Sequence, residues 1–136
     1  MSKYLLDSDI IIAFLRGEKK TIKLLKDLEK IAGVPATSPI CVAEVQAGVR
    51  SGEEEKTNGF LESLKIYVLD RGIANKAGEY IREYQKRGIT LLLPDALISA
   101  TCTINSLILA TYNIKHYPMP EVKFAQPGFG NLNPMR

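Results

Sequence analysis

Acidic side chains interrupt apolar stretches of this sequence at points where a folded core would exclude them. Asp7 and Asp9 lie between an apolar run at 4–6 and another at 10–14, so core-type residues flank both ionisable groups. Removing such groups from water costs several kcal/mol unless a cation or dense hydrogen bonding compensates them. Since ligands of open α/β sheets bind beyond the carboxyl ends of the strands, we expect a polar site at Asp7. That Ser8 or Asp9 simply caps the following helix is an open alternative.

Two later acids also lie in apolar surroundings. At about 100° per residue, Glu44 falls on the small, apolar side of an expected helix at 39–50, which argues against an ordinary surface position. Asp95 opens an expected helix at 95–105 whose residues are apolar on nearly every side. An aspartate there can simply cap the helix or interact with its dipole, but the mouth of a buried helix lies at the edge of the core. Both acids are therefore candidates to meet Asp7.

Polar residues follow the last apolar run, at 107–111. If this run is a strand parallel to the one at 4–6, its carboxyl end lies on the same edge of the sheet as Asp7, which brings Thr111 and Asn113 within reach of the site. His116, the one histidine of the chain, follows in the same loop. It could act as a metal ligand or a base, or take no part.

The metal-ligand atoms that these residues offer limit the reactions that the site could catalyse. Clustered carboxylate oxygens without cysteine or further histidine ligands suit a hard cation such as Mg²⁺ or Mn²⁺ rather than zinc. Such ions activate water and neutralise charge that builds up on a phosphoryl oxygen, so phosphodiester hydrolysis is the natural reaction. The sequence shows no serine or cysteine nucleophile beside a base and no glycine motif that would cradle phosphates.

The elements that must position these residues alternate between short strands and helices. We expect strands at 4–6, 34–37, 64–69 and 107–111, an edge strand at 122–124, and helices at 10–17, 18–31, 39–50, 73–86 and 95–105. Helical spacing places Ile22, Leu25, Leu28 and Ile31 on the inner side of one helix and Ala74, Ala77, Tyr80, Ile81 and Tyr84 on that of another. The alternation predicts an α/β protein with a mostly parallel sheet.

Length and composition fit one domain over residues 1–125, followed by a weakly patterned, flexible tail at 126–136. The net charge of +3 is compatible with a nucleic-acid partner but is not diagnostic, and the lysines of the helix at 18–31 could equally form a solvated face. Cys41 and Cys102 have small and apolar neighbours, which indicates reduced, buried side chains in a cytoplasmic protein. The sequence has neither a signal-peptide pattern nor a stretch long enough to span a membrane.

Four segments of the chain follow one another in a characteristic order: YLLDSDIIIAFLRG at 4–17, SPICVAEVQAGV at 38–49, PDALISATC at 94–102 and LILATYNIKHY at 107–117. Together they resemble the PIN-domain family, and within it the small ribonuclease toxins of VapBC toxin–antitoxin modules. The resemblance implies a three-layer α/β/α sandwich around a short, mostly parallel sheet, with acidic residues gathered in one groove that holds Mg²⁺ or Mn²⁺.

Carried over to this chain, the resemblance matches Asp7, Glu44 and Asp95 to the family's first three acids. They would hold the cation directly or through water. The fourth acidic position is here occupied by Asn113, which would be auxiliary. Asp9 could supply part of the missing charge, or act only as a helix cap. Thr111 would donate a hydrogen bond to a metal-ligating carboxylate.

The leading hypothesis is a metal-dependent endoribonuclease that hydrolyses RNA phosphodiester bonds with activated water. The resemblance further implies a toxin that forms a homodimer and binds a cognate antitoxin, whose tail occupies the acidic groove. We also expect that replacing Asp7 or Asp95 with asparagine leaves the metal-free fold intact or stabilises it, because repulsion among the acids is relieved.

Two other functions are open at this point. One is a catalytically weakened module on the same fold that binds RNA or protein. The other is a phosphatase of the haloacid dehalogenase type, because Asp7 and Asp9 after a strand imitate its nucleophile and acid pair. That fold also needs a later lysine and paired acids after a glycine, which we cannot place in this sequence.

Overall fold

The computed structural model describes residues 3–125, so the predicted tail at 126–136 lies outside the described residues. Its centre is a five-stranded sheet in the order β3-β2-β1-β4-β5, and every strand pair is parallel. The strands are β1 (Tyr4–Leu6), β2 (Ala36–Thr37), β3 (Lys65–Ile66), β4 (Ile108–Ala110) and β5 (Lys123–Phe124). The predicted α/β class with a short parallel sheet is confirmed, including the edge strand near residue 122.

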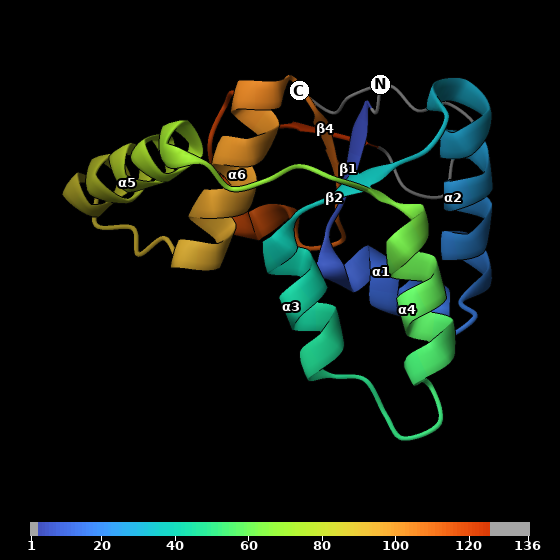
Figure 1. The fold of residues 1–136 in the computed structure, drawn as a ribbon. Coiled ribbons are helices and arrows are strands. Elements are labelled where there is room, and N and C mark those ends of the chain that lie inside the picture. The colour runs from blue at the N-terminus through green and yellow to red at the C-terminus, as the bar shows by residue number, and fades with distance from the viewer. Residues whose placement is uncertain (1–2, 126–136) are drawn as a thin grey trace.

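Within residues 3–125, six α-helices and one 3-10 turn surround the sheet. They are α1 (Ser8–Leu15), α2 (Lys19–Ala32), α3 (Pro39–Ala47), α4 (Glu54–Ser63), α5 (Arg71–Lys86), α6 (Leu93–Asn105) and η1 (Ile114–His116). Figure 1 shows α5 and α6 on one side of the strands and α2 on the other, which gives three layers. The helices α1, α3 and α4 gather near the points where β1 and β2 end.

The two central strands explain the apolar runs of the sequence. Every residue of β1 and β4 is buried, as in parallel sheets that are covered on both faces. Leu5 pairs with Leu109, and the ladder continues past β1 because the Asp7 amide donates to the Ala110 carbonyl at 3.0 Å. This parallel register carries the residues after β1 and those after β4 to the same edge of the sheet.

Local capping residues account for three helix ends, whereas the starts of α1 and α6 differ from the prediction: α6 begins at Leu93, and its N-cap residue is Leu92 rather than Asp95. Ser38 and Asp70 cap α3 and α5 with their side chains, and Gly33 ends α2 with a φ of 74°. The expectation that Ser8 or Asp9 caps α1 is wrong. The N-cap residue is Asp7, whose carboxylate accepts from the Ser8 amide.

Other boundaries and faces also differ from the prediction. The helix α3 ends at Ala47 rather than near Arg50, and α4 is absent from the helices predicted above. Strand β3 covers only two residues of the predicted 64–69, and Val68 is 68% exposed beyond it. Ile31 is 57% exposed, and the buried face of α2 consists of Thr21, Leu24, Leu25 and Leu28. On α5, Ile73 is buried in place of the predicted Ala74.

Both cysteines are unpaired and buried, as predicted. Among residues 3–125, no helix combines the length and the apolar character needed to cross a bilayer.

Candidate active site

Asp7 lies at the carboxyl end of β1 and is 5% exposed. Its Oδ1 accepts from the Ser8 amide at 2.8 Å, and its Oδ2 accepts from the hydroxyls of Thr111 at 2.8 Å and Tyr117 at 2.7 Å. Dense hydrogen bonding of this kind compensates a buried carboxylate for the water it has lost. The fold thus holds an acidic group in one orientation at the sheet edge.

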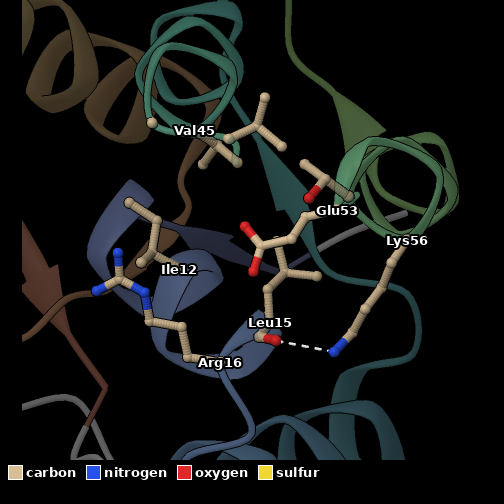
Figure 2. Close-up of a pocket in the computed structure, with 9 residues that line it drawn as sticks. Ile12, Leu15, Arg16, Val45, Glu53 and Lys56 are labelled. Carbon is tan, nitrogen blue, oxygen red and sulfur yellow. Dashed lines mark hydrogen bonds between the residues drawn. The ribbon is translucent and has the colours of Figure 1, made fainter. Parts of the chain in front are cut away.

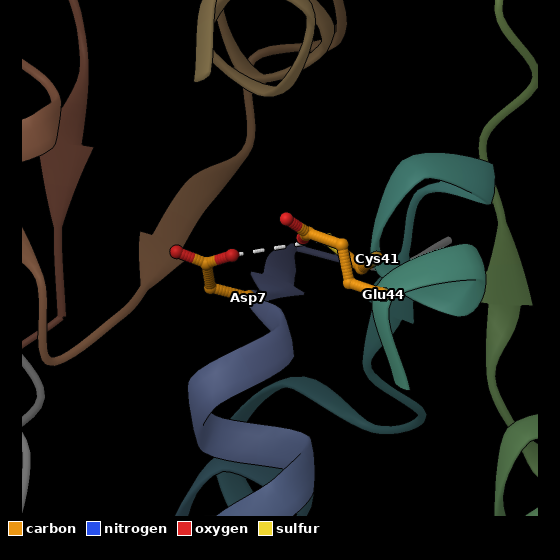
Figure 3. A group of neighbouring side chains, drawn as sticks. All are labelled: Asp7, Cys41 and Glu44. Atoms are coloured by element: carbon orange, nitrogen blue, oxygen red, sulfur yellow. Dashed lines mark hydrogen bonds between the residues drawn. The ribbon is translucent and has the colours of Figure 1, made fainter. Parts of the chain in front are cut away.

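Glu44 projects from α3 toward Asp7 (Figure 3). Ligand atoms of Asp7, Cys41 and Glu44 all lie within 4.8 Å of one another, so this group could hold a metal ion. Glu44 itself is exposed, which corrects the expectation of an apolar burial site. The small residues around Glu44 leave its carboxylate open to solvent, and what distinguishes it from an ordinary surface acid is its closeness to Asp7.

The Cys41 thiol lies 3.9 Å from Asp7 Oδ1 (Figure 3). Burial and the nearby Asp7 charge raise the pKa of this thiol to about 12, so it stays protonated near neutral pH. A protonated thiol is a weak hydrogen-bond donor and a poor ligand, since metals bind the thiolate. The donor set that is available to an ion therefore consists of carboxylate oxygens, which fits a hard divalent cation such as Mg²⁺ or Mn²⁺.

Asp95 lies in the first turn of α6, and its side chain is 16% exposed. Burial raises the pKa of this carboxyl; the nearby His116 opposes the shift, and the charges of Asp7 and Glu44 add to it. The predicted acids therefore act on one another electrostatically, although Asp95 lies outside the group that closes to 4.8 Å. Nδ1 of His116 lies 3.8 Å from the Asp95 carboxylate, an approach that becomes an ion pair when the imidazole is protonated.

Asp9 ties α1 to the loop that follows β4. Its Oδ1 accepts from the Ile10 amide at 2.8 Å, and its Oδ2 accepts from the Tyr112 amide at 2.8 Å and lies 3.4 Å from the Thr111 hydroxyl. Burial and the Asp7 charge raise the pKa of Asp9, while these hydrogen bonds lower it. Both oxygens of Asp9 are thus engaged by the protein itself.

Thr111 and Asn113 occupy the loop as the parallel register predicts. The Thr111 hydroxyl donates to Asp7 and accepts from the Asn113 amide at 3.0 Å. The exposed Asn113 side chain lies at the start of η1, and its auxiliary role stays a prediction.

Tyr117 is the site residue that sequence reasoning missed. It is 1% exposed, and its hydroxyl donates to Asp7 across 110 positions of the chain. Burial and the charge of Asp7 raise its pKa, so the phenol remains a proton donor. The only local signal is its place at the end of the segment 107–117, and an apolar core role would explain that position equally well.

Two hollows lie near these groups. The first is a crevice of about 60 Å³ between α1, α3 and α4, where Lys56 donates to the Leu15 carbonyl at 2.9 Å; none of the predicted acids lines it (Figure 2). The second has a volume of about 330 Å³ and contains Asp95, Lys115 and His116 in its wall. It places two basic side chains beside an acid of the candidate site.

Residues 4–122 match the PIN domain family, and the chain therefore belongs to that family. The haloacid dehalogenase alternative is thereby wrong.

The chain is similar to two ribonucleases over most of its length. It is 36% identical over 127 residues to ribonuclease VapC10 of Mycobacterium tuberculosis, which covers 91% of this chain and 95% of that protein. It is 32% identical over 117 residues to ribonuclease VapC19 of the same species, covering 85% and 92% of the two chains.

Solved structures of similar fold come from toxin–antitoxin complexes. A chain of such a complex from Klebsiella pneumoniae superposes with a TM-score of 0.73 at 30% identity, covering 88% of this chain and 95% of that chain. A chain of the VapBC2 complex from Rickettsia felis, bound to a DNA fragment from their promoter, gives a TM-score of 0.75 at 26% identity and covers 88% and 94%.

Proposed function

We propose that this chain is an endoribonuclease, the toxin component of a toxin–antitoxin system, and that it hydrolyses RNA phosphodiester bonds with the help of a divalent metal ion. The observation that carries the proposal is the convergence of Asp7 and Glu44 at the carboxyl edge of a PIN-domain sheet. The identity with two ribonucleases over most of the chain supports the choice of substrate.

The roles of the acids follow from their surroundings. Asp7 and Glu44 would bind Mg²⁺ or Mn²⁺ directly, since their oxygens lie within reach of one ion. Asp95 would bind it directly or through water, because it responds to the charges of both other acids. A cation held there lowers the pKa of a coordinated water and offsets negative charge on a phosphoryl oxygen.

Other residues of the site would orient these groups and attract the substrate. Thr111 fixes Asp7, Asp9 fixes the loop that carries Thr111, and Asn113 has an auxiliary role at the exposed side of that loop. Lys115 places positive charge and His116 an imidazole in the wall of the hollow beside Asp95, where a polyanionic RNA can approach.

We extend the proposal to the partners of this chain. Similar solved chains belong to toxin–antitoxin complexes, and we propose a cognate antitoxin whose tail covers the acidic groove. We also propose a homodimer and a cytoplasmic location, where cellular RNA is accessible.

A second candidate function has one observation in its favour. Asn113 is neutral at the position where the family commonly has a fourth acid, which would weaken the hold on a metal ion. A catalytically weakened PIN domain that binds RNA or protein would show RNA binding without metal-dependent cleavage.

RNA cleavage with and without metal tests the proposal. Purified protein incubated with bulk cellular RNA should cleave it in Mg²⁺ or Mn²⁺ and stop when EDTA is added. Asp95→Asn should abolish most of this activity, whereas Glu79→Gln, which removes an exposed acid of α5, should leave it unchanged. Cleavage that survives EDTA, or that is unchanged in both Asp95→Asn and Asp7→Asn, would falsify the assignment.

A further inference from the structure

The two oxygens of the Asp7 carboxylate have different surroundings. Oδ2 accepts two hydroxyl protons, from Thr111 at 2.8 Å and from Tyr117 at 2.7 Å. Oδ1 accepts the Ser8 amide proton at 2.8 Å and a weak, long hydrogen bond from the Cys41 thiol at 3.9 Å, and it lies on the side of Glu44 (Figure 3). Two hydroxyls at short distance occupy the lone-pair positions of Oδ2, whereas one of the two donors to Oδ1 is a weak thiol contact that a cation can replace, so Oδ1 is the oxygen with capacity left toward Glu44.

We propose that Tyr117 is a positioning residue of the metal centre. Its hydroxyl, together with that of Thr111, occupies Asp7 Oδ2 and leaves Oδ1 as the oxygen that a divalent cation shares with Glu44. Asp7 would then be a ligand through one oxygen only. This inference rests on the proposed function, since it requires that the acids bind a cation.

The hydroxyl and the ring of Tyr117 make different contacts, so a substitution can remove the hydroxyl and keep the ring. The ring lies in the core, with its centroid 6.3 Å from that of Phe124, and a phenylalanine would fill the same space. The hydroxyl makes its hydrogen bond to Asp7. Thr111 cannot replace it, because a threonine has one hydroxyl proton and its contact with Asp7 already uses it.

The consequence for metal binding follows from the freedom that Asp7 would gain. Without the tyrosine hydroxyl, Oδ2 keeps a single donor. The carboxylate can then rotate, and Oδ1 is no longer held on the side of Glu44. Loss of a group that orients a metal ligand reduces metal affinity or activity by about 10–100-fold in other proteins. We expect a similar loss here.

The experiment is calorimetric titration of Mn²⁺ into the metal-free protein and into Tyr117→Phe. The variant should bind Mn²⁺ at least about 10-fold more weakly than the wild type. Tyr80→Phe is the matched control, since Tyr80 is also a buried tyrosine whose hydroxyl donates to a carboxylate, that of Glu121 at 2.9 Å, and it should bind Mn²⁺ like the wild type. RNA cleavage at limiting Mn²⁺ should fall in Tyr117→Phe and recover partly at high Mn²⁺.

Thr111→Val and the double variant extend the test. Because both hydroxyls act on one oxygen, the double variant should lose less affinity than the product of the two single losses. Thermal unfolding without metal, measured for every variant, reports the purely structural contribution of each hydroxyl.

Each outcome decides between the proposals. If Tyr117→Phe loses thermal stability but binds Mn²⁺ as tightly as the wild type, Tyr117 has a structural role and the inference is wrong. If the wild type itself binds no Mn²⁺, the proposed metal-dependent function fails first and the inference fails with it.

Discussion

Asp7 and Asp95 are two carboxylates of one candidate site in opposite circumstances. Asp7 is buried, yet two hydroxyls and a backbone amide donate to it. Asp95 is partly exposed, lies beside His116, and its pKa is raised by burial and by the charges of Asp7 and Glu44. The comparison indicates that hydrogen-bond donors, more than exposure, determine how well a fold stabilises an ionised carboxylate.

The contrast has a topological cause. Asp7 follows a central strand whose neighbour β4 delivers Thr111 and, through η1, Tyr117 to the same edge of the sheet. Asp95 lies in the first turn of a helix, beside the hollow that also contains Lys115 and His116. The first acid is held by contacts at the sheet edge, whereas the second lines a hollow together with two basic side chains. We expected that replacing Asp7 or Asp95 with asparagine would leave the metal-free fold intact or stabilise it. Given these contacts, we now predict stabilisation for Asp95 alone.

The largest expected effect comes from removing the Asp7 side chain. Asp7→Ala deletes the N-cap of α1 and leaves the hydroxyls of Thr111 and Tyr117 without their acceptor. We expect the free energy of unfolding to fall by about 3 kcal/mol in EDTA. Urea denaturation measures it, with the exposed Glu44→Ala as control, expected within about 0.5 kcal/mol of the wild type. Equal losses in the two variants would show that the hydrogen bonds of Asp7 contribute nothing.

The next effect is stabilisation by the metal itself. At a free Mn²⁺ concentration of 100 times the dissociation constant, the wild type should gain about 2.7 kcal/mol, because the ion binds the folded state. Asp95→Asn should gain less, since it lacks one of the three acids. If Mn²⁺ raises the melting temperature equally in the wild type and in Asp95→Asn, Asp95 does not contribute to metal binding.

The smallest effect is that of Asp95→Asn without metal. Since Asp95 has a raised pKa in the folded state, its ionised form disfavours folding, and the variant should melt about 2 °C higher than the wild type at neutral pH. The wild type gains relative stability as the pH falls through the raised pKa of Asp95 toward the unfolded value of 3.8, because the folded state takes up the proton first.

The stability difference between the two proteins should therefore shrink as the pH falls through this range, which thermal melts in EDTA at several pH values would measure. A difference that is independent of pH would mean that Asp95 carries no electrostatic strain.

The sequence by itself determined most of the elements in their order, without α4, and pointed to the acids of the candidate site. Alternating apolar runs predict β1 and β4 because central parallel strands are apolar on both faces, and Ser38, Asp70 and Gly33 mark helix ends through local hydrogen bonds and backbone conformation. Asp7, Glu44 and Asp95 were candidates because each interrupts an apolar pattern or matches a family segment.

Only the tertiary structure decided which groups surround those acids. The hydroxyl of Tyr117 reaches Asp7 across 110 positions, through the register of β1 with β4, and no local pattern encodes that contact. The exposure of Glu44 and of Ile31 likewise depends on which neighbours cover each helix face. Helical periodicity is a property of a single segment, whereas burial and hydrogen bonding at a site are properties of the segments that meet there.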